Sequence, residues 1–283
     1  MGPKLSLSPH SKSSKFSFMG DCHSHRTTLR SYVETAEMRK VEFGFLMGDF
    51  VDYDEDANYR HFIDRIGDPK IPIFLVRGNH EALNFNDEDS NRYLDYIPKS
   101  NYYFIHAGIL FGVLDNSGRC FKPGVIEEAN IELSKFRKMF PDGTIILTMH
   151  IPPNVEGTRS KDLIPSSSKR LLRLCKKYKV EYILCGHLHD EAETTYEGTK
   201  IIVDGCGGGS ILSTSTQCHY LEFTNMNGQL NIEKVPLERD NPAISRIDYI
   251  INVSVDQYRF WFIAISLLLF IRELISISRM KNV

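Results

Sequence analysis

The 283-residue sequence lacks several features that would assign it to a specialised class of protein. Its six cysteines are scattered, without the CxxC spacing of a zinc knuckle or the density of a secreted disulfide scaffold. The formal net charge is only -2, so no general attraction to nucleic acid is expected. Residues 1–15 are basic and rich in Ser, without the apolar stretch of a secretory signal. These absences favour a cytoplasmic protein with reduced thiols and a disordered N-terminal arm over residues 1–15.

No uninterrupted apolar run reaches the roughly 20 residues that a membrane-spanning helix needs. The strongest candidate is FWFIAISLLLFI, which precedes Arg272 and Glu273. We expect a hydrophobic C-terminal helix over residues 258–279, joined to the rest by a polar connector over residues 238–257. A tail anchor, an interfacial helix and a helix packed in a soluble protein or oligomer all remain open. A helix that is apolar on every face favours membrane contact, and hence a cytoplasmic protein attached to a membrane through its C-terminus.

Between residues 16 and 237, short β-branched or aromatic runs alternate with stretches of helical pattern, which indicates one domain. FSFMGD, FGFLMGD and IPIFLVRGNH are predicted strands, separated by helices near residues 27–40 and 57–67. This alternation is typical of an α/β protein with a parallel sheet. Further predictions are a hairpin in NYYFIHAGILFGVLDN, a helix near 124–140, a strand in TIILTMH, a basic helix near 167–178, strands in EYILCGHLHD and TKIIVDGCGGG, and a hairpin of HYLEFTN and QLNIEKV.

Side chains of metal-binding type follow several of these strands. They are Asp21 and His23, Asp49 and Asp52, Asn79 and His80, His150, and His187 and His189. Ligands bind at strand ends in open α/β sheets, so these residues are expected to converge on one crevice. Imidazoles mixed with carboxylates and one amide suit Mn, Fe or Zn better than Ca or Mg. The set is too large for one ion. A pair of divalent ions bridged by Asp49 is predicted, and such a pair can bind a phosphate and lower the pKa of a shared water.

The motifs GDCHSH, GDFVD, GNHE, MHIPP and GHLH occur in this order between residues 20 and 189, and their succession resembles the calcineurin-like metallophosphoesterases. The resemblance covers about residues 16–236. It implies a four-layer α/β/β/α sandwich in which two β-sheets face each other between helices. It also implies two ions, Mn or Fe with Zn possible. The implied ligands are Asp21, His23 and His189 for one ion, Asn79, His150 and His187 for the other, and Asp49 as the bridge. His80 would lie over the substrate, steadied by the carboxylate of Asp52, and help the leaving oxygen depart.

Two details of the sequence concern where the chain departs from the family pattern and which members of the family it resembles. The first motif usually reads GDxHG, but here Ser24 replaces the glycine and His25 follows. His25 is therefore a candidate substrate contact, with simple exposure to solvent as the alternative. YYFIHAGILFGVLDN and HIPP resemble the cyclic-nucleotide phosphodiesterase and purple-acid-phosphatase side of the family. Protein Ser/Thr phosphatases would show GDxVDRG and GNHES, whereas Tyr53 and Ala82 stand at the corresponding places, which argues against that role.

The function implied is hydrolysis of a phosphate ester, most readily a phosphodiester, by attack of a metal-bridging hydroxide. A lipid-linked pyrophosphate hydrolase at the membrane is one alternative, since an apolar C-terminal helix could bring the site to acyl chains. A non-catalytic scaffold is another, although the ligand set and His80 are complete. The expected partners are a small phosphate-ester or lipid-phosphate substrate and a membrane, contacted through residues 258–279. Nucleic acid is not expected, because the acidic run in VDYDEDANYR would repel a polyanion. The oligomeric state remains open.

Overall fold

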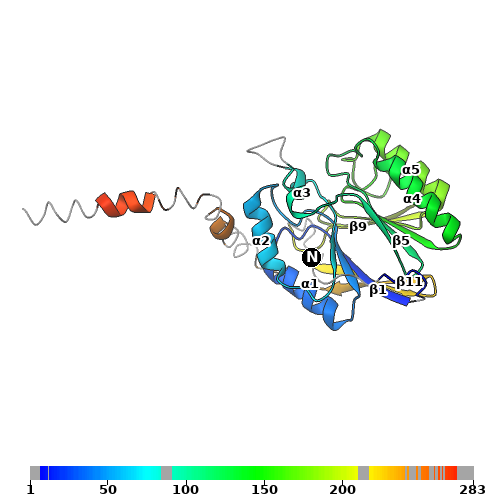
Figure 1. Ribbon diagram of the computed structural model, residues 1–283, viewed down its shortest axis with the longest axis horizontal. Helices are drawn as coiled ribbons and strands as arrows, with labels where there is room; N and C mark the ends of the chain where they lie inside the picture. The colour runs from blue at the N-terminus through cyan, green and yellow to red at the C-terminus, as the bar shows by residue number, and fades with distance from the viewer. Residues whose placement is uncertain are drawn as a thin grey trace, which may run out of the picture.

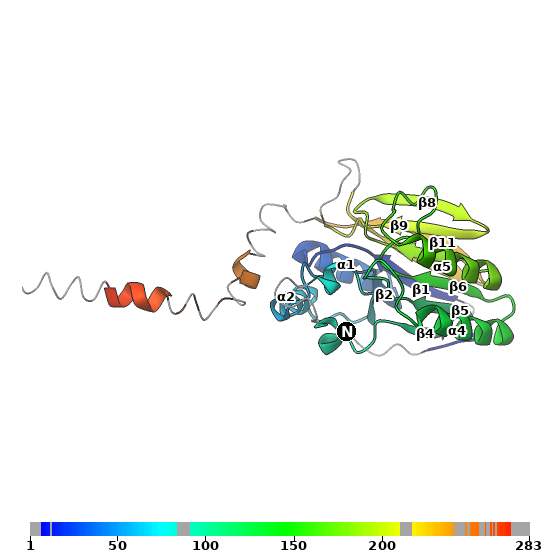
Figure 2. The same cartoon turned by 90° about the horizontal axis from the view of Figure 1, so that it is seen from above.

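The computed structural model describes residues 7–11, 13–83, 91–209, 217–239, 241, 247, 250–254, 258, 261, 263 and 265–272. Two β-sheets pack against each other, and helices cover their outer faces (Figures 1 and 2). The predicted four-layer α/β/β/α sandwich is confirmed.

The first sheet has the strand order β11-β10-β1-β2-β3. Its strands are β1 (Ser13–Met19), β2 (Phe43–Leu46), β3 (Ile73–Leu75), β10 (His219–Met226) and β11 (Gln229–Pro236). β1, β2 and β3 are parallel, so their carboxyl ends lie at one edge, while β10 runs antiparallel to β1. The outer face is covered by α1 (Arg26–Met38) and α2 (Asp56–Ile66). Short helices η1 (His80–Ala82) and α3 (Tyr93–Tyr96) follow β3.

The second sheet has the order β4-β5-β6-β7-β9-β8. Its strands are β4 (Tyr102–His106), β5 (Ile109–Val113), β6 (Thr144–Thr148), β7 (Tyr182–Cys185), β8 (Glu191–Tyr196) and β9 (Thr199–Asp204). The central strands β5, β6, β7 and β9 are parallel. Helices α4 (Val125–Met139) and α5 (Pro165–Tyr178) cover the outer face, with Leu133, Leu171 and Cys175 buried between the layers. The sequence did not predict β8, whose residues EAETTY are either exposed or only partly buried.

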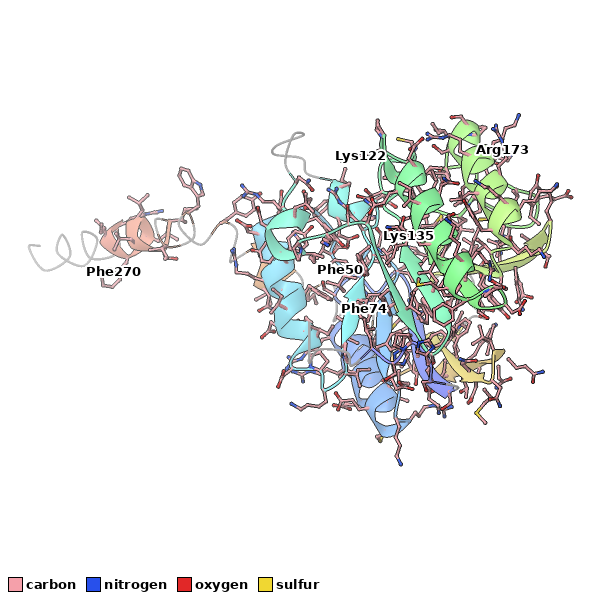
Figure 3. All side chains as sticks on the ribbon, turned by 45° about the vertical axis from the view of Figure 1, so that its right-hand side comes forward. Phe50, Phe74, Lys122, Lys135, Arg173 and Phe270 are labelled. Carbon is pink, nitrogen blue, oxygen red and sulfur yellow. The ribbon has the colours of Figure 1, made fainter. Side chains whose placement is uncertain are left out.

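Alternation along the strands explains why two sheets form rather than one. In β1, Phe16 and Phe18 point between the sheets, where Phe18 stacks on Phe45 of β2 with ring centroids 4.7 Å apart. Ser17 points the other way, and its hydroxyl lies 2.9 Å from that of Tyr32 on α1. A strand buried on both faces needs another layer on each side. Figure 3 shows Phe74 of β3 and Phe50 inside the body, with Lys135 and Arg173 on the outer helices.

The predicted turns have the backbone that their residues favour. Ala107 and Gly108 both adopt positive φ between β4 and β5, and Asn227 and Gly228 do so between β10 and β11. Two successive residues with positive φ form the turn that matches the twist of a two-residue β-hairpin. Both predicted hairpins are confirmed.

The two ends of the domain differ from the prediction. β1 begins at Ser13, so assigning residues 13–15 to a disordered arm was wrong, because they pair with β10. The amide of Ala107 also donates to the carbonyl of Ser8. Residues 1–6 of the predicted arm lie outside the described residues. In the predicted connector 238–257, residues 250–254 form a short π-helix, η2 (Ile250–Ser254), which packs on α2 and buries Val253.

The C-terminal hydrophobic segment is described only at residues 258, 261, 263 and 265–272, which are helical. Its large apolar side chains are exposed, including Trp261, Leu268 and Phe270. Figures 1 and 3 show this helix apart from the sandwich. Within the part of the chain that the structure describes, no helix combines the length and apolar character needed to cross a membrane.

Candidate metal centre

The nine residues that the sequence placed after strands lie together where both sheets end. Asp21 and His23 follow β1, Asp49 and Asp52 follow β2, Asn79 and His80 follow β3, His150 follows β6, and His187 and His189 follow β7. Five predicted ligands adopt positive φ: Asp21, His23, Asp49, His187 and His189. Left-handed backbone is unfavourable for residues with a Cβ and collects at functional sites. Tight turns at the strand ends thus aim these side chains into one space.

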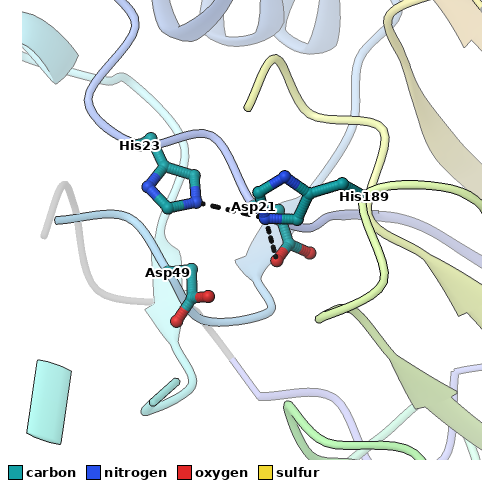
Figure 4. A group of neighbouring side chains, drawn as sticks. All are labelled: Asp21, His23, Asp49 and His189. Atoms are coloured by element: carbon teal, nitrogen blue, oxygen red, sulfur yellow. Dashed lines mark hydrogen bonds and ion pairs between the residues drawn. The ribbon is translucent and has the colours of Figure 1, made fainter. Parts of the chain in front are cut away.

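The first group of ligand atoms consists of Asp21, His23, Asp49 and His189, which lie within 4.8 Å of one another (Figure 4). Nε2 of His23 lies 3.3 Å from Nε2 of His189, which is 3.4 Å from Oδ1 of Asp21. The Nδ1–H of His23 donates to Oδ1 of Asp52 at 2.8 Å. A carboxylate behind an imidazole sets the tautomer and directs the other nitrogen toward an ion.

The second group consists of Asp49, His150 and His187, again within 4.8 Å of one another. The amide oxygen of Asn79 lies 3.0 Å from Nε2 of His150 and 2.8 Å from Nδ1 of His187. The Nδ1–H of His150 donates to the carbonyl of Met47 at 2.8 Å, which leaves Nε2 facing the group. Asp49 is only 2% exposed and belongs to both groups. The structure therefore brings together both predicted ligand sets, with Asp49 between them.

The electrostatics of the centre suit a cation. Burial raises the pKa of Asp49, but the facing imidazoles, His150 foremost, outweigh it and lower that pKa far below its usual range. Burial lowers the pKa of His150, yet Asp49 raises it to about 10. Likewise Asp52 raises the pKa of His23 to about 9 against the effect of burial. The carboxylates thus favour positive charge at the centre. Divalent ions would supply it with the imidazoles neutral, so metal binding would release protons.

Glu81 holds the loops of the centre together, a role that the sequence analysis did not assign. Its carboxylate is buried and accepts hydrogen bonds from four backbone N–H groups. The donors are Asp49 at 2.9 Å, Phe50 at 2.8 Å, Val51 at 3.0 Å and Gly78 at 2.6 Å. One side chain therefore joins the loop after β2 to the loop after β3. Its position as the last residue of the GNHE motif could have indicated a role at the site. The sequence could not show which backbone N–H groups donate to its carboxylate.

The geometry of His80 differs from the expectation. The carboxylate of Asp52 contacts His23, whereas the Nδ1–H of His80 donates to the backbone carbonyl of Asp52 at 2.8 Å. The backbone N–H of His80 donates to Oδ1 of Asp49 at 3.0 Å. Nε2 of His80 is 3.9 Å from Oδ2 of Asp49, and the side chain is 29% exposed. Asp52 thus supports His80 through its main chain, because its side chain is already engaged by His23.

The departure from the usual first motif also has a structural reason. The buried hydroxyl of Ser24 donates to the carbonyl of Phe50 at 2.6 Å, which ties the loop after β1 to the loop after β2. His25 is partly buried at the start of α1 and belongs to neither ligand group. Its predicted substrate contact stays a prediction.

Asp162 is a further residue that the sequence analysis missed. It lies in the segment before α5, and its Oδ2 is 2.9 Å from Nε2 of His187. Nδ1 of His187 faces Asn79, so Asp162 contacts the ring nitrogen on the other side, as Asp52 does for His23. No local motif marks Asp162, because it approaches the centre from a long connection between β6 and α5.

Glycines let the backbone come close to these carboxylates. A Cβ on Gly186 would lie 2.4 Å from Oδ2 of Asp21, and one on Gly78 would lie 2.2 Å from Oδ1 of Asp49. Gly205, after β9, would meet the backbone nitrogen of His189 at 2.6 Å. Any side chain at these three positions would displace a ligand.

Two relatives are similar to this chain over more than half of its length. A probable glycerophosphodiester phosphodiesterase of Arcobacter nitrofigilis is 27% identical over 172 residues, which are 58% of this chain and 62% of that protein. The 3',5'-cyclic adenosine monophosphate phosphodiesterase of Escherichia coli K12 is 23% identical over 183 residues, or 62% of this chain and 65% of that protein. The chain thus spans somewhat less than two thirds of the length of these two relatives.

Solved structures share the fold. A purple acid phosphatase from yellow lupin seeds aligns with a TM-score of 0.63 at 16% identity, covering 83% of this chain and 55% of that one. A dimetal phosphatase from Danio rerio aligns with a TM-score of 0.58 at 12% identity, covering 80% and 99%. Residues 14–191, more than half of the chain, match the family described as calcineurin-like phosphoesterase. The chain therefore belongs to the calcineurin-like phosphoesterase family.

Proposed function

We propose that this protein is a metal-dependent phosphoric ester hydrolase that uses two divalent ions and favours phosphodiesters. The observation that carries the proposal is the buried Asp49 carboxylate, which two separate groups of ligand atoms share. The oxygen and imidazole donors fit Mn, Fe or Zn. When bound, such ions would polarise the phosphoryl oxygens and lower the pKa of a water.

Among the groups that do not hold an ion, His80 is suited to proton transfer. Its Nδ1–H is fixed on the carbonyl of Asp52, and its partly exposed ring leaves Nε2 at the edge of the centre beside Asp49. A protonated Nε2 can donate its proton to the leaving alkoxide as the P–O bond breaks. Asp52 orients His23 at the same time, so one residue supports both the ligand set and the proton donor.

The preference for a diester is supported by the relatives, whose names specify glycerophosphodiesters and 3',5'-cyclic adenosine monophosphate as substrates. A diester carries one negative charge, whereas a monoester carries nearly two at neutral pH, so one enzyme can distinguish them. The preference is tested by comparing the diester bis-p-nitrophenyl phosphate with the monoester p-nitrophenyl phosphate in the presence of Mn²⁺.

The first experiment measures metal content and both hydrolysis rates for wild type, Asp49→Asn and the exposed control Asp142→Asn. We expect at least two ions per chain and faster diester hydrolysis in wild type and control. In Asp49→Asn at least one ion should be lost, and the rate should fall about 100-fold or more. The same number of ions in Asp49→Asn as in wild type would refute the bridging role. Two ions in wild type with no hydrolysis of either compound would favour a selective pyrophosphate substrate, and no metal would favour a scaffold.

A second experiment separates His80 from the ligands. His80→Ala should lower the turnover number about 100-fold, within the range for general acid catalysis, while the metal content stays at the wild-type value. Loss of an ion in this variant would show that His80 is a ligand.

We further propose that residues 258–279 contact a membrane surface. The support is the exposed helix around Leu268 and Phe270, together with Trp261, since apolar surface of this kind is rarely left in water. This contact would place the site near lipid-phosphate substrates, such as a lipid-linked pyrophosphate. Full-length protein and a chain ending at residue 240 would be compared in sedimentation with phospholipid vesicles. Equal sedimentation of the two would refute membrane contact.

A further inference from the structure

A second group of ligand-type side chains lies outside the candidate metal centre and is not needed by it. Glu191 is the first residue of β8, Asp204 ends β9, Cys206 follows β9, and His219 begins β10. Ligand atoms of Glu191, Cys206 and His219 lie within 4.8 Å of one another. Oδ2 of Asp204 is 3.3 Å from Nε2 of His219. We call these four residues the β8–β10 cluster.

The β8–β10 cluster joins the two sheets. β8 and β9 belong to the second sheet, while β10 belongs to the first. Figure 2 shows β8 and β9 on the same side of the molecule as β11, and Lys234 of β11 makes an ion pair with Glu191. The side chains thus meet in the gap between sheet edges, where no strand pairing holds the layers together.

Two buried atoms of the β8–β10 cluster make no hydrogen bond within the described residues. The Nδ1–H of His219 donates to the carbonyl of Gln217 at 2.8 Å, so Nε2 faces the cluster. Nε2 of His219 and Oδ2 of Asp204 are both buried and face each other at 3.3 Å as an ion pair, but neither makes a hydrogen bond within the described residues. His219 is 4% exposed and Asp204 is 2% exposed. Buried polar atoms without a hydrogen bond are rare and can mark the place of a ligand, and the bond from Nδ1–H to Gln217 leaves Nε2 of His219 available to an ion.

The donor types indicate which ion would fit. One thiol, one imidazole and two carboxylates suit Zn²⁺, which prefers four nitrogen, sulfur or oxygen ligands. Burial and the neighbouring Asp204 and Glu191 raise the pKa of Cys206. Without a cation the thiol therefore keeps its proton, and an ion would bind as that proton leaves. A thiolate and two carboxylates around Zn²⁺ leave one net negative charge, which Lys234 can balance beside Glu191.

An ion could reach the β8–β10 cluster from solvent, since the side chain of Glu191 is 34% exposed. Glu191, Cys206 and His219 would supply three donors, and Asp204 beside His219 would be the fourth. Four protein donors close the coordination shell, which is typical of a structural rather than a catalytic site. The site would also support the candidate metal centre, because Gly205 lies between Asp204 and Cys206 and packs directly against the backbone of His189.

We propose that Glu191, Asp204, Cys206 and His219 form a structural Zn²⁺ site that fastens the two sheets beside the candidate metal centre. The proposal does not depend on the hydrolytic function, because the four residues lie outside the candidate metal centre. The alternative is a proton network in which an imidazolium at His219 lies between the two carboxylates and the thiol takes no part.

The test uses full-length protein loaded with Co²⁺ in place of Zn²⁺, because a Co²⁺–thiolate bond gives a charge-transfer absorption in the near ultraviolet. The predicted ligands of the candidate metal centre include no thiol, so this absorption reports only the β8–β10 cluster. We expect the band in wild type, in Asp49→Asn and in the control Cys120→Ser, and its loss in Cys206→Ser and His219→Gln. Absence of the band in wild type, or its persistence in Cys206→Ser, would overturn the proposal.

Stability gives an independent readout. In the Asp49→Asn background, Zn²⁺ should bind with one more tight equivalent per chain than in Asp49→Asn/Cys206→Ser and raise the thermal unfolding midpoint, since a ligand that binds only the folded state stabilises it. The same addition should leave the midpoint of Asp49→Asn/Cys206→Ser unchanged. Circular dichroism of the metal-free variants would verify that both are folded. An equal rise of the midpoint in both variants would assign the effect to another site and refute the proposal.

Discussion

Replacing Glu81 with glutamine tests whether one buried carboxylate organises the loops of the metal centre. Each oxygen of Glu81 accepts two backbone N–H groups: Oε1 from Phe50 and Val51, and Oε2 from Asp49 and Gly78. Glutamine keeps one oxygen but turns the other acceptor into an NH₂ donor. Whichever way the amide faces, two N–H groups lose their acceptor and meet another donor.

The size of the effect follows from these contacts. A hydrogen bond to a charged acceptor contributes about 1.5–3 kcal/mol, so losing two lowers the free energy of unfolding by about 3–6 kcal/mol. This is a large share of the roughly 5–15 kcal/mol that stabilises a typical domain. Burial and the nearby Asp49 raise the pKa of Glu81 to about 7, and this cost of ionising the buried carboxyl offsets part of the loss. The comparison is made at pH 8, where the wild-type carboxylate is largely ionised.

The assay is urea unfolding of metal-free protein at pH 8, for wild type, Glu81→Gln and the exposed control Glu156→Gln. Removing metal first separates loop stability from ligand binding. The control should lie within about 0.5 kcal/mol of wild type, as surface substitutions usually do. A loss below about 1 kcal/mol in Glu81→Gln would refute the idea that this carboxylate joins the two loops.

Three other substitutions probe separate contacts. Asp162→Asn should weaken metal binding about 10- to 100-fold by calorimetric titration, because it removes the carboxylate behind His187; unchanged affinity would show that Asp162 does not orient this ligand. Gly78→Ala should reduce the number of bound ions measured by atomic absorption, since the added Cβ would lie 2.2 Å from Oδ1 of Asp49, and full occupancy would contradict this. Burial raises the pKa of Glu222, but its ion pairs with Arg39 and Lys15 outweigh burial and lower that pKa below its ordinary value. These ion pairs therefore stabilise the folded protein above the ordinary carboxyl pKa, and this stabilisation is lost as pH falls through the lowered value. Glu222→Gln should therefore cost about 1–3 kcal/mol in urea unfolding at pH 7, and this cost should shrink as the pH falls and the carboxyl becomes protonated in the folded state. A cost that does not change with pH would count against the ion pairs.

Much of the architecture could be read from local pattern. The predicted helix near 57–67 is α2 over Asp56–Ile66, and the helix near 124–140 is α4 over Val125–Met139. These helices have one apolar face, and that periodicity is a property of neighbouring residues alone. β8 was missed for the converse reason, since a polar edge strand has no apolar alternation and forms only because β9 offers it a backbone partner.

The sequence by itself determined the ligand types of the metal centre, because strand ends converge in parallel sheets and each motif keeps its ligands next to a strand. Only the tertiary structure decided how the supporting groups pair. It placed the carboxylate of Asp52 on His23 rather than His80, and brought Asp162 to His187 from a distant loop. It also gathered the β8–β10 cluster from two sheets. Contacts of this kind depend on how whole layers pack against each other, and the spacing of residues along the chain does not determine that packing.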